Sequence, residues 1–184
     1  SRARLHTAIT TRALRTLMAE SFMRHGEPLS RHVRLVGARP TGPAILLNWH
    51  LGACRLARPA LRAAGLKPLL ISAFATHDPD LAYLGPESRV DERAAVALRA
   101  LRQLRAGGLV MTMGDGPMGD RAVPVSVLGH TPRMRVGPAT LAHLSRAPVH
   151  PVSATWVDAP NRHVEVLVHP ALDLPYTIAR DAFV

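Results

Sequence analysis

The stretch AILLNWHLG, residues 44–52, decides the fold of this chain. Its first four residues form an uninterrupted apolar run, which is typical of a strand buried on both faces of a sheet. The residues that follow, Leu51–Ala64, predict a helix that Pro59 kinks or ends early. His50 therefore stands at the carboxyl end of a strand, where open α/β sheets place their chemistry.

The alternation of strands and helices continues along the chain. Apolar runs and alternating valines predict further strands at His32–Val36, Pro68–Ala73, Leu109–Met113, Val123–Val127, Val149–Val157 and His163–Val168. Helical spacing predicts helices at Asp91–Arg105 and Gly137–Leu144, with loops at His77–Pro86 and Gly114–Asp120. In the longer helix, one apolar face is expected to contain Ala94, Ala95, Leu98, Leu101 and Leu104. This pattern predicts an α/β fold with a mixed, largely parallel central sheet flanked by helices.

We expect a single domain over residues 1–184 and, because the chain begins with Ser1 in place of methionine, a fragment trimmed at both ends. Residues 1–27 contain an amphipathic pattern, with arginines between apolar residues over Leu5–His25. This pattern predicts a helix. It either packs on the domain or lies on a membrane with its arginines toward lipid phosphates.

The chain is strongly basic, with 23 basic and 13 acidic residues and a net charge of +10. This excess favours an anionic partner, such as a phospholipid surface, phosphate groups, an acidic carrier protein or nucleic acid. We expect no nucleic-acid partner, because the arginines are scattered and only 4% of the residues are aromatic; a basic nucleic-acid-binding α/β domain is the less favoured alternative. Cys54 is the single cysteine, so no internal disulfide can form. No uncharged apolar run reaches the roughly 18 residues that a membrane span needs.

His50 is the first candidate for chemistry. Its imidazole suits proton transfer near neutral pH and could take a proton from a hydroxyl that attacks an acyl group. Gly52 would let a substrate approach the backbone at the start of the following helix, where free N–H groups favour an oxyanion or a phosphate. The alternative is a histidine that only forms a structural hydrogen bond at the end of a strand.

The segment Gly114–Arg121 is the second candidate. It also follows a buried strand, so it can meet His50 at the same edge of the sheet. Asp115, between two glycines, can approach a ligand closely or orient an imidazole, whereas the alternative is an ordinary turn.

Arg133 and Arg135 form the third candidate, since two arginines shortly before a helix suggest anion capture, against the alternative of a solvated loop. The ten histidines show no paired metal-ligand spacing. The chain also lacks both a Gly-x-x-x-x-Gly-Lys phosphate loop and the Gly-x-Ser-x-Gly elbow of serine hydrolases.

Together, segments from about Val33 to Pro170 resemble the lysophospholipid acyltransferase superfamily, and within it the lauroyl and myristoyl transferases of lipid A biosynthesis. Four blocks stand in the family's order: His50-Leu51-Gly52, Leu101–Val110, Gly114-Asp115-Gly116 with Val123–Gly129, and Gly137–Ala142 leading into Ala147–Val152. The resemblance implies a glycerol-3-phosphate acyltransferase-like fold. It also implies transfer of a fatty acyl chain from acyl carrier protein or acyl-CoA to a hydroxyl of a lipid or glycolipid. On this basis we expect no metal or bound cofactor, and a peripheral location at the cytoplasmic face of a bacterial inner membrane.

The resemblance also implies roles for single residues. The histidine of the family's His-x-x-x-x-acid motif is the general base, which corresponds to His50, but the acid position holds Arg55. Three explanations stay open. In the first, Asp115 supplies the carboxylate, in a block where the family places a functional acid. In the second, Arg55 binds a substrate phosphate or carboxylate while His50 acts unsupported. Or catalysis is lost, leaving a lipid-binding relative.

Substrate contacts are expected from residues that flank these blocks. Backbone N–H groups near Gly52 would stabilise an oxyanion. Arg89 is the best match to the family's substrate-side arginine, and three later arginines are candidates for phosphate or carrier contacts. The full expected set is Asn48, Gly52, Arg55, Arg89, Gly114, Gly116, Arg121, Arg133 and Arg135.

Overall fold

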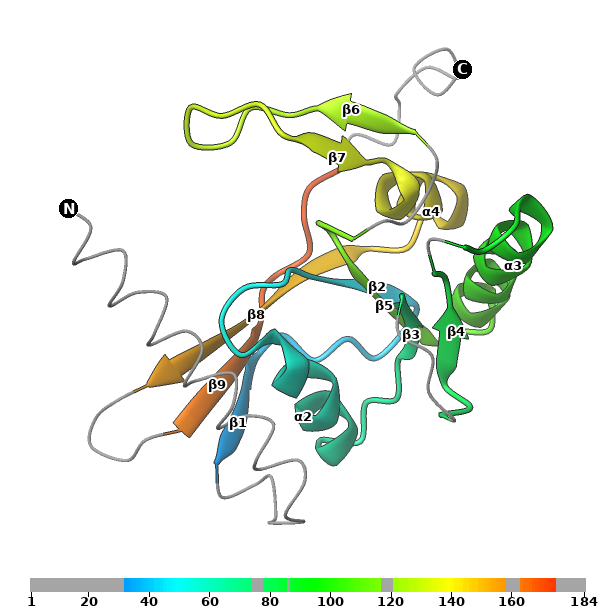
Figure 1. Ribbon diagram of the computed structural model, residues 1–184. Helices are drawn as coiled ribbons and strands as arrows, with labels where there is room; N and C mark the ends of the chain where they lie inside the picture. The colour runs from blue at the N-terminus through cyan, green and yellow to red at the C-terminus, as the bar shows by residue number, and fades with distance from the viewer. Residues whose placement is uncertain (1–31, 74–77, 86, 117–120, 158–162, 175–184) are drawn as a thin grey trace.

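The computed structural model describes residues 32–73, 78–85, 87–116, 121–157 and 163–174. The amphipathic segment Leu5–His25 lies outside the described residues. The described part forms a seven-stranded sheet with helices on both faces and a separate two-stranded ribbon (Figure 1). None of the described helices is both long enough and apolar enough to cross a bilayer.

The large sheet confirms the predicted fold class. Its strand order is β1-β9-β8-β2-β5-β3-β4. Every neighbouring pair is parallel except β8 and β9, so the sheet is mixed and largely parallel. The strands are β1 (Val33–Gly37), β2 (Ala44–Asn48), β3 (Leu69–Ser72), β4 (Leu81–Tyr83), β5 (Leu109–Met113), β8 (Val149–Val157) and β9 (His163–Val168).

Helices cover both faces of this sheet. The short 3₁₀ helix η2 (Cys54–Leu56) and α2 (Ala57–Ala63) share one buried cluster with Leu46 of β2. On the other face, α3 (Val90–Arg105) and α4 (Gly137–Ser145) share a cluster with Ile45. Successive side chains of a strand point to opposite faces, so the central strand β2 contributes to both cores. This explains its continuous apolar run.

The helix after β2 begins later than the sequence predicts. Residues 50–53 form a bend and turn, η2 follows, and α2 begins only at Ala57. Pro59 therefore falls in the first turn of α2, where its missing N–H leaves no hydrogen bond unmade. The prediction that Pro59 kinks or ends the helix is wrong, since Pro59 lies near its start.

Other differences from the prediction are local. The expected loop His77–Pro86 contains the short edge strand β4. The valine-rich segment forms β6 (Ala122–Pro124), which pairs antiparallel with β7 (Arg133–Arg135) and not with the large sheet. The expected apolar face of α3 is only partly right. Leu104 is buried and Leu101 partly buried, but the other three members are exposed: Ala94, Ala95 and Leu98.

Candidate active site

The carboxyl ends of β2 and β5 bring His50 and Asp115 into contact. The two strands are parallel neighbours, with Asn48 opposite Met113, so the residues that follow them meet at one edge of the sheet. Nδ1 of His50 lies 2.9 Å from Oδ1 of Asp115. The backbone N–H of His50 also donates to Oδ2 of Asp115 at 3.0 Å. One carboxylate therefore holds both the ring and the backbone of the histidine.

This contact has a chemical consequence for the imidazole. A carboxylate facing Nδ1 favours the neutral tautomer that carries its proton there, which leaves Nε2 as an acceptor. The side chain of His50 is 51% exposed and that of Asp115 33% exposed. A substrate hydroxyl can therefore reach the ring from solvent. The arrangement is competent for general base chemistry.

Buried polar contacts support the turn that carries His50. Asn48 is only 2% exposed. Its side-chain amide donates to the carbonyl of Cys54 at 3.3 Å, and its side-chain oxygen accepts from the N–H of Trp49 at 2.9 Å. These bonds tie the end of β2 to η2 and favour a supporting role for Asn48. Its expected substrate contact stays a prediction.

Two glycines allow close approaches beside the His50–Asp115 pair. Gly52 has a φ of +59°, and a Cβ there would lie 2.3 Å from the carbonyl oxygen of Ala154. At Gly114 a Cβ would lie 2.8 Å from the indole of Trp49. Gly114 also donates its N–H to the carbonyl of Asn48 at 2.7 Å. Larger side chains would displace the strand ends that position the pair.

The remaining expected loop glycine, Gly116, is buried beside β5, where a Cβ would lie 3.1 Å from the Cβ of Met113. Its backbone N–H donates to the carbonyl of Met113 at 3.4 Å, which closes the turn that carries Asp115.

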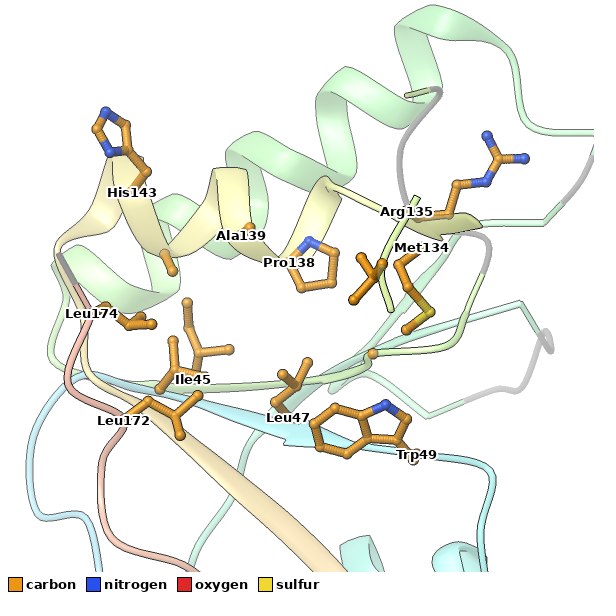
Figure 2. A pocket seen from close by; sticks show the side chains of 14 residues that line it. Ile45, Leu47, Trp49, Met134, Arg135, Pro138, Ala139, His143, Leu172 and Leu174 are labelled. Carbon is orange, nitrogen blue, oxygen red and sulfur yellow. The ribbon is translucent and has the colours of Figure 1, made fainter. Parts of the chain in front are cut away.

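An apolar pocket of about 320 Å³ begins next to the pair. Trp49 and Gly114, the residues directly before His50 and Asp115, both line it. Figure 2 shows Pro138 and Ala139 of α4 facing the side chains of β2 across the pocket. The full lining is Ile45, Leu47, Trp49, Gly114, Val125, Met134, Arg135, Pro138, Ala139, Ala142, His143, Val149, Leu172 and Leu174.

The predicted arginines do not form one cluster with the pair. Arg55 lies exposed on η2, five residues after His50. Arg89 is the N-cap residue of α3; it pairs with Asp91 at 3.0 Å, and its N–H donates to Glu92 at 2.8 Å. These local contacts account for the position of Arg89 without a ligand.

The three later arginines belong to the ribbon. Arg121 precedes β6, and Arg133 and Arg135 lie on β7; all three are exposed. Arg135 lines the pocket, with its guanidinium directed away from the apolar side chains (Figure 2). Of the five expected arginines, Arg135 alone lines this pocket.

From the sequence, an apolar lining for an acyl chain is expected from the helices, and of the expected site residues only Gly114 and Arg135 line this pocket; Trp49 and Met134 were missed. The available signal was the period of two that joins Ile45, Leu47 and Trp49 on one face of β2. Met134 gave no such signal, because it sits between arginines. Among the described residues, no group of three His, Cys, Asp or Glu side chains is arranged to hold a metal ion.

Comparison with known protein families gives a match. The family described as bacterial lipid A biosynthesis acyltransferase matches residues 89–182. The match includes Asp115, the ribbon and α4, and it begins after His50. No curated protein matches the chain.

Proposed function

The chain belongs to the bacterial lipid A biosynthesis acyltransferase family, and from that premise we propose that it transfers a fatty acyl chain from a thioester to a hydroxyl of a lipid or glycolipid. The single observation that carries the proposal is the His50–Asp115 contact of 2.9 Å beside an apolar pocket. A base and an acyl-chain site must be adjacent in any enzyme that esterifies an alcohol with a fatty acid.

In the proposed reaction, the acceptor hydroxyl oxygen attacks the thioester carbonyl while Nε2 of His50 takes the hydroxyl proton. Asp115 orients the ring and stabilises the imidazolium that forms. The tetrahedral intermediate then collapses: the C–S bond breaks, and the leaving thiolate takes the proton from the imidazolium. The products are an ester and a free thiol, and the histidine returns to its starting state.

We assign the oxyanion to backbone N–H groups near Gly52. Two observations support this assignment. Gly52 is exposed in the turn that follows His50, and it has no side chain to shield the backbone. Its predicted place in the first turn of a helix is wrong, because α2 begins at Ala57. The stabilisation would therefore come from single N–H groups and not from a helix N-terminus.

The apolar pocket is the proposed site of the acyl chain. Ile45, Leu47 and Trp49 line it along β2, and a strand rises about 3.3 Å per residue, so this wall is about 13 Å long. An extended alkyl chain advances about 1.25 Å per carbon, so the wall matches about ten carbons. The carbonyl end would lie at Trp49, next to His50, with the methyl end toward Leu174.

Acyl carrier protein or acyl-CoA is the proposed donor, because both present the acyl group as a thioester on an anionic carrier. Arg121, Arg133 and Arg135 are the proposed contacts for phosphate or for an acidic carrier surface. The proposed location is the cytoplasmic face of the inner membrane, where such donors and a lipid acceptor meet. No metal or bound cofactor is part of the proposed reaction.

Mass spectrometry of acyl transfer tests this proposal. The chain is incubated with an acyl donor and a glycolipid acceptor, and ester product is quantified. We expect His50→Ala to lower the rate about 10²- to 10⁴-fold, the usual contribution of a general base. A matched control is His32→Ala, at the start of the edge strand β1, which should keep the wild-type rate. A wild-type chain that binds lipid but never forms product would instead support the catalytically impaired relative suggested by Arg55.

A further inference from the structure

The β6–β7 ribbon is a feature that the proposed chemistry leaves largely unused. It stands apart from the large sheet, above α4 in the view of Figure 1. Hydrogen bonds extend it beyond the named strands: the N–H of Val125 donates to Pro132 at 3.0 Å, and Val127 and His130 exchange bonds of 2.8 and 2.9 Å. A two-stranded ribbon has no core of its own, so its apolar side chains stay in contact with solvent unless a partner covers them.

The ribbon presents an apolar stripe. Val123, Val125 and Val127 alternate along one strand and are 42%, 38% and 44% exposed. Met134 pairs opposite Val123 and so lies on the same face. Because Val125 and Met134 also line the acyl pocket, this stripe runs from the tip of the ribbon to the pocket.

Leu128, at the tip of the ribbon, has both an exposed side chain and an unfavourable backbone conformation. Its side chain is 95% exposed, and its backbone has a φ of +50°, followed by +79° at Gly129. Two successive positive φ values are typical of a type I′ hairpin turn, where Asn-Gly or Asp-Gly is strongly preferred. A leucine there is disfavoured by both the backbone and the solvent. This combination points to a use for the side chain outside the folded domain.

The segment that carries this stripe has charged side chains of one sign only. The sequence from Arg121 to Val157 contains no aspartate or glutamate. Arg133 and Arg135 pair opposite Pro124 and Ala122, which places them on the face opposite the valines. A ribbon with an apolar tip, one apolar face and arginines on its other face matches the boundary of a membrane whose headgroups are anionic, because long arginine side chains can extend back to the lipid phosphates. A bilayer can receive Leu128 without a matching pocket, whereas a protein partner would have to supply one.

We propose that the β6–β7 ribbon docks on an anionic phospholipid leaflet, with Leu128 and the valine stripe among the acyl chains and Arg133 and Arg135 on lipid phosphates. Docking would connect the membrane interior to the mouth of the acyl pocket. The inference deepens the proposed function and rests on it for that purpose. Docking is measured as vesicle binding, without acyl transfer. A failure of the docking proposal can therefore be told apart from a failure of the proposed function.

The first test compares two leucine-to-asparagine variants in binding to vesicles of phosphatidylethanolamine and phosphatidylglycerol. Asparagine suits the positive φ at position 128, so Leu128→Asn should unfold at the wild-type temperature or above it. We expect its partitioning onto these vesicles to fall about 10- to 100-fold, the factor that burial of one leucine side chain contributes. Leu98→Asn, on the exposed face of α3 and 51% exposed, is the matched control and should bind as wild type.

A second measurement locates the contact directly. Cys54 is the single cysteine, so Leu128→Cys in a Cys54→Ser background gives one labelling site. An environment-sensitive fluorophore there should shift to shorter wavelength with these vesicles and be quenched by lipids brominated on their chains. The same label introduced by Leu98→Cys should change little. Replacing phosphatidylglycerol with phosphatidylcholine should weaken binding, by about fivefold for each arginine that reaches the surface.

His50→Ala should bind vesicles as wild type, which separates docking from catalysis. Unchanged vesicle binding by Leu128→Asn, or a label at position 128 that stays in water, would overturn the proposal. Loss of binding in Leu98→Asn alone would place the membrane contact on α3. A Leu128→Asn variant that loses affinity for an acidic carrier protein, yet keeps its affinity for vesicles, would assign the ribbon to a protein partner.

Discussion

Replacing Asp115 by asparagine tests the contact on which the proposed chemistry depends. The carboxylate faces Nδ1 of His50 at 2.9 Å and accepts the backbone N–H of His50 at 3.0 Å. Asparagine has nearly the same shape and keeps one acceptor oxygen, but it has no charge. The variant therefore removes the attraction for an imidazolium and, because its amide nitrogen cannot accept, also one of the two hydrogen bonds from His50.

Coulomb's law sets the size of the effect. Unit charges at the observed 2.9 Å attract by about 1.4 kcal/mol in water and by about 5.7 kcal/mol at an effective dielectric constant of about 20. The side chains of His50 and Asp115 are 51% and 33% exposed, so solvent screening favours the lower part of this range, about 1.4–2.8 kcal/mol. Since about 1.4 kcal/mol corresponds to a factor of ten, kcat should fall about 10- to 100-fold.

The assay measures initial rates of ester formation for Asp115→Asn, His50→Ala and the double variant. Because Asp115 acts through His50, the double variant should be no slower than His50→Ala alone. Asp91→Asn, which removes an exposed carboxylate paired with Arg89, is the matched control and should keep the wild-type rate. Thermal unfolding of each variant shows that it is folded. A wild-type rate in Asp115→Asn, or losses that multiply in the double variant, would refute the reasoning.

Three further predictions concern other parts of the chain. Arg55→Glu should bring no gain in rate, because Asp115 already occupies Nδ1 of His50; a rise above tenfold in the same assay would contradict this. Ala139→Phe, which narrows the acyl pocket, should lower kcat/KM for long-chain donors about tenfold and spare short ones, whereas the exposed Ala94→Phe should change neither. Asp78→Asn should cost about 1 kcal/mol at pH 7, or about 2–4 °C in Tm, since Asp78 pairs with Arg58 and Arg62 at 2.8 Å. The hydrogen bond from Arg58 lowers the pKa of Asp78 below its usual 3.8, so the difference from wild type should hold above that pH and vanish in thermal melts as the pH falls through the lowered value.

The strands with clear apolar patterns were predicted well. The bounds of β2, β5, β8 and β9 agree with the prediction, because β2 and β5 are nearly continuous apolar runs, β8 and β9 combine buried apolar residues with polar ones, and each strand is followed by polar or turn residues. β4 was missed since three residues are too few to show a period. β7 was missed since arginines on both sides of Met134 hide its alternation. In both cases the strand exists because a neighbouring strand pairs with it, which local pattern does not reveal.

In the candidate site, too, features that follow from local pattern could be predicted, and features that depend on packing could not. The shared sheet edge of His50 and Asp115 could be predicted, because adjacent parallel strands must end together. The residues that line the pocket could not, because they come from β2, β8, the ribbon, α4 and the segment after β9, and only the packing of these elements brings them together. The ion pair of Arg89 could not be predicted either, because it depends on how the Arg89 side chain turns back toward Asp91 at the start of α3.

The position of Trp49 links the two halves of the proposed site. Its neighbour in sequence, His50, turns toward Asp115, while its own indole packs on Gly114 and forms one end of the acyl pocket. Four residues therefore set both the distance from His50 to the carboxylate and the point where an acyl chain would end: Trp49, His50, Gly114 and Asp115. An acid at position 55 would have to reach His50 across the turn that precedes η2, whereas Asp115 stands in the turn after β5, next to Gly114, which lines the pocket. In the proposed enzyme, a carboxylate in the turn after β5 would thus couple the orientation of the base to the placement of the substrate.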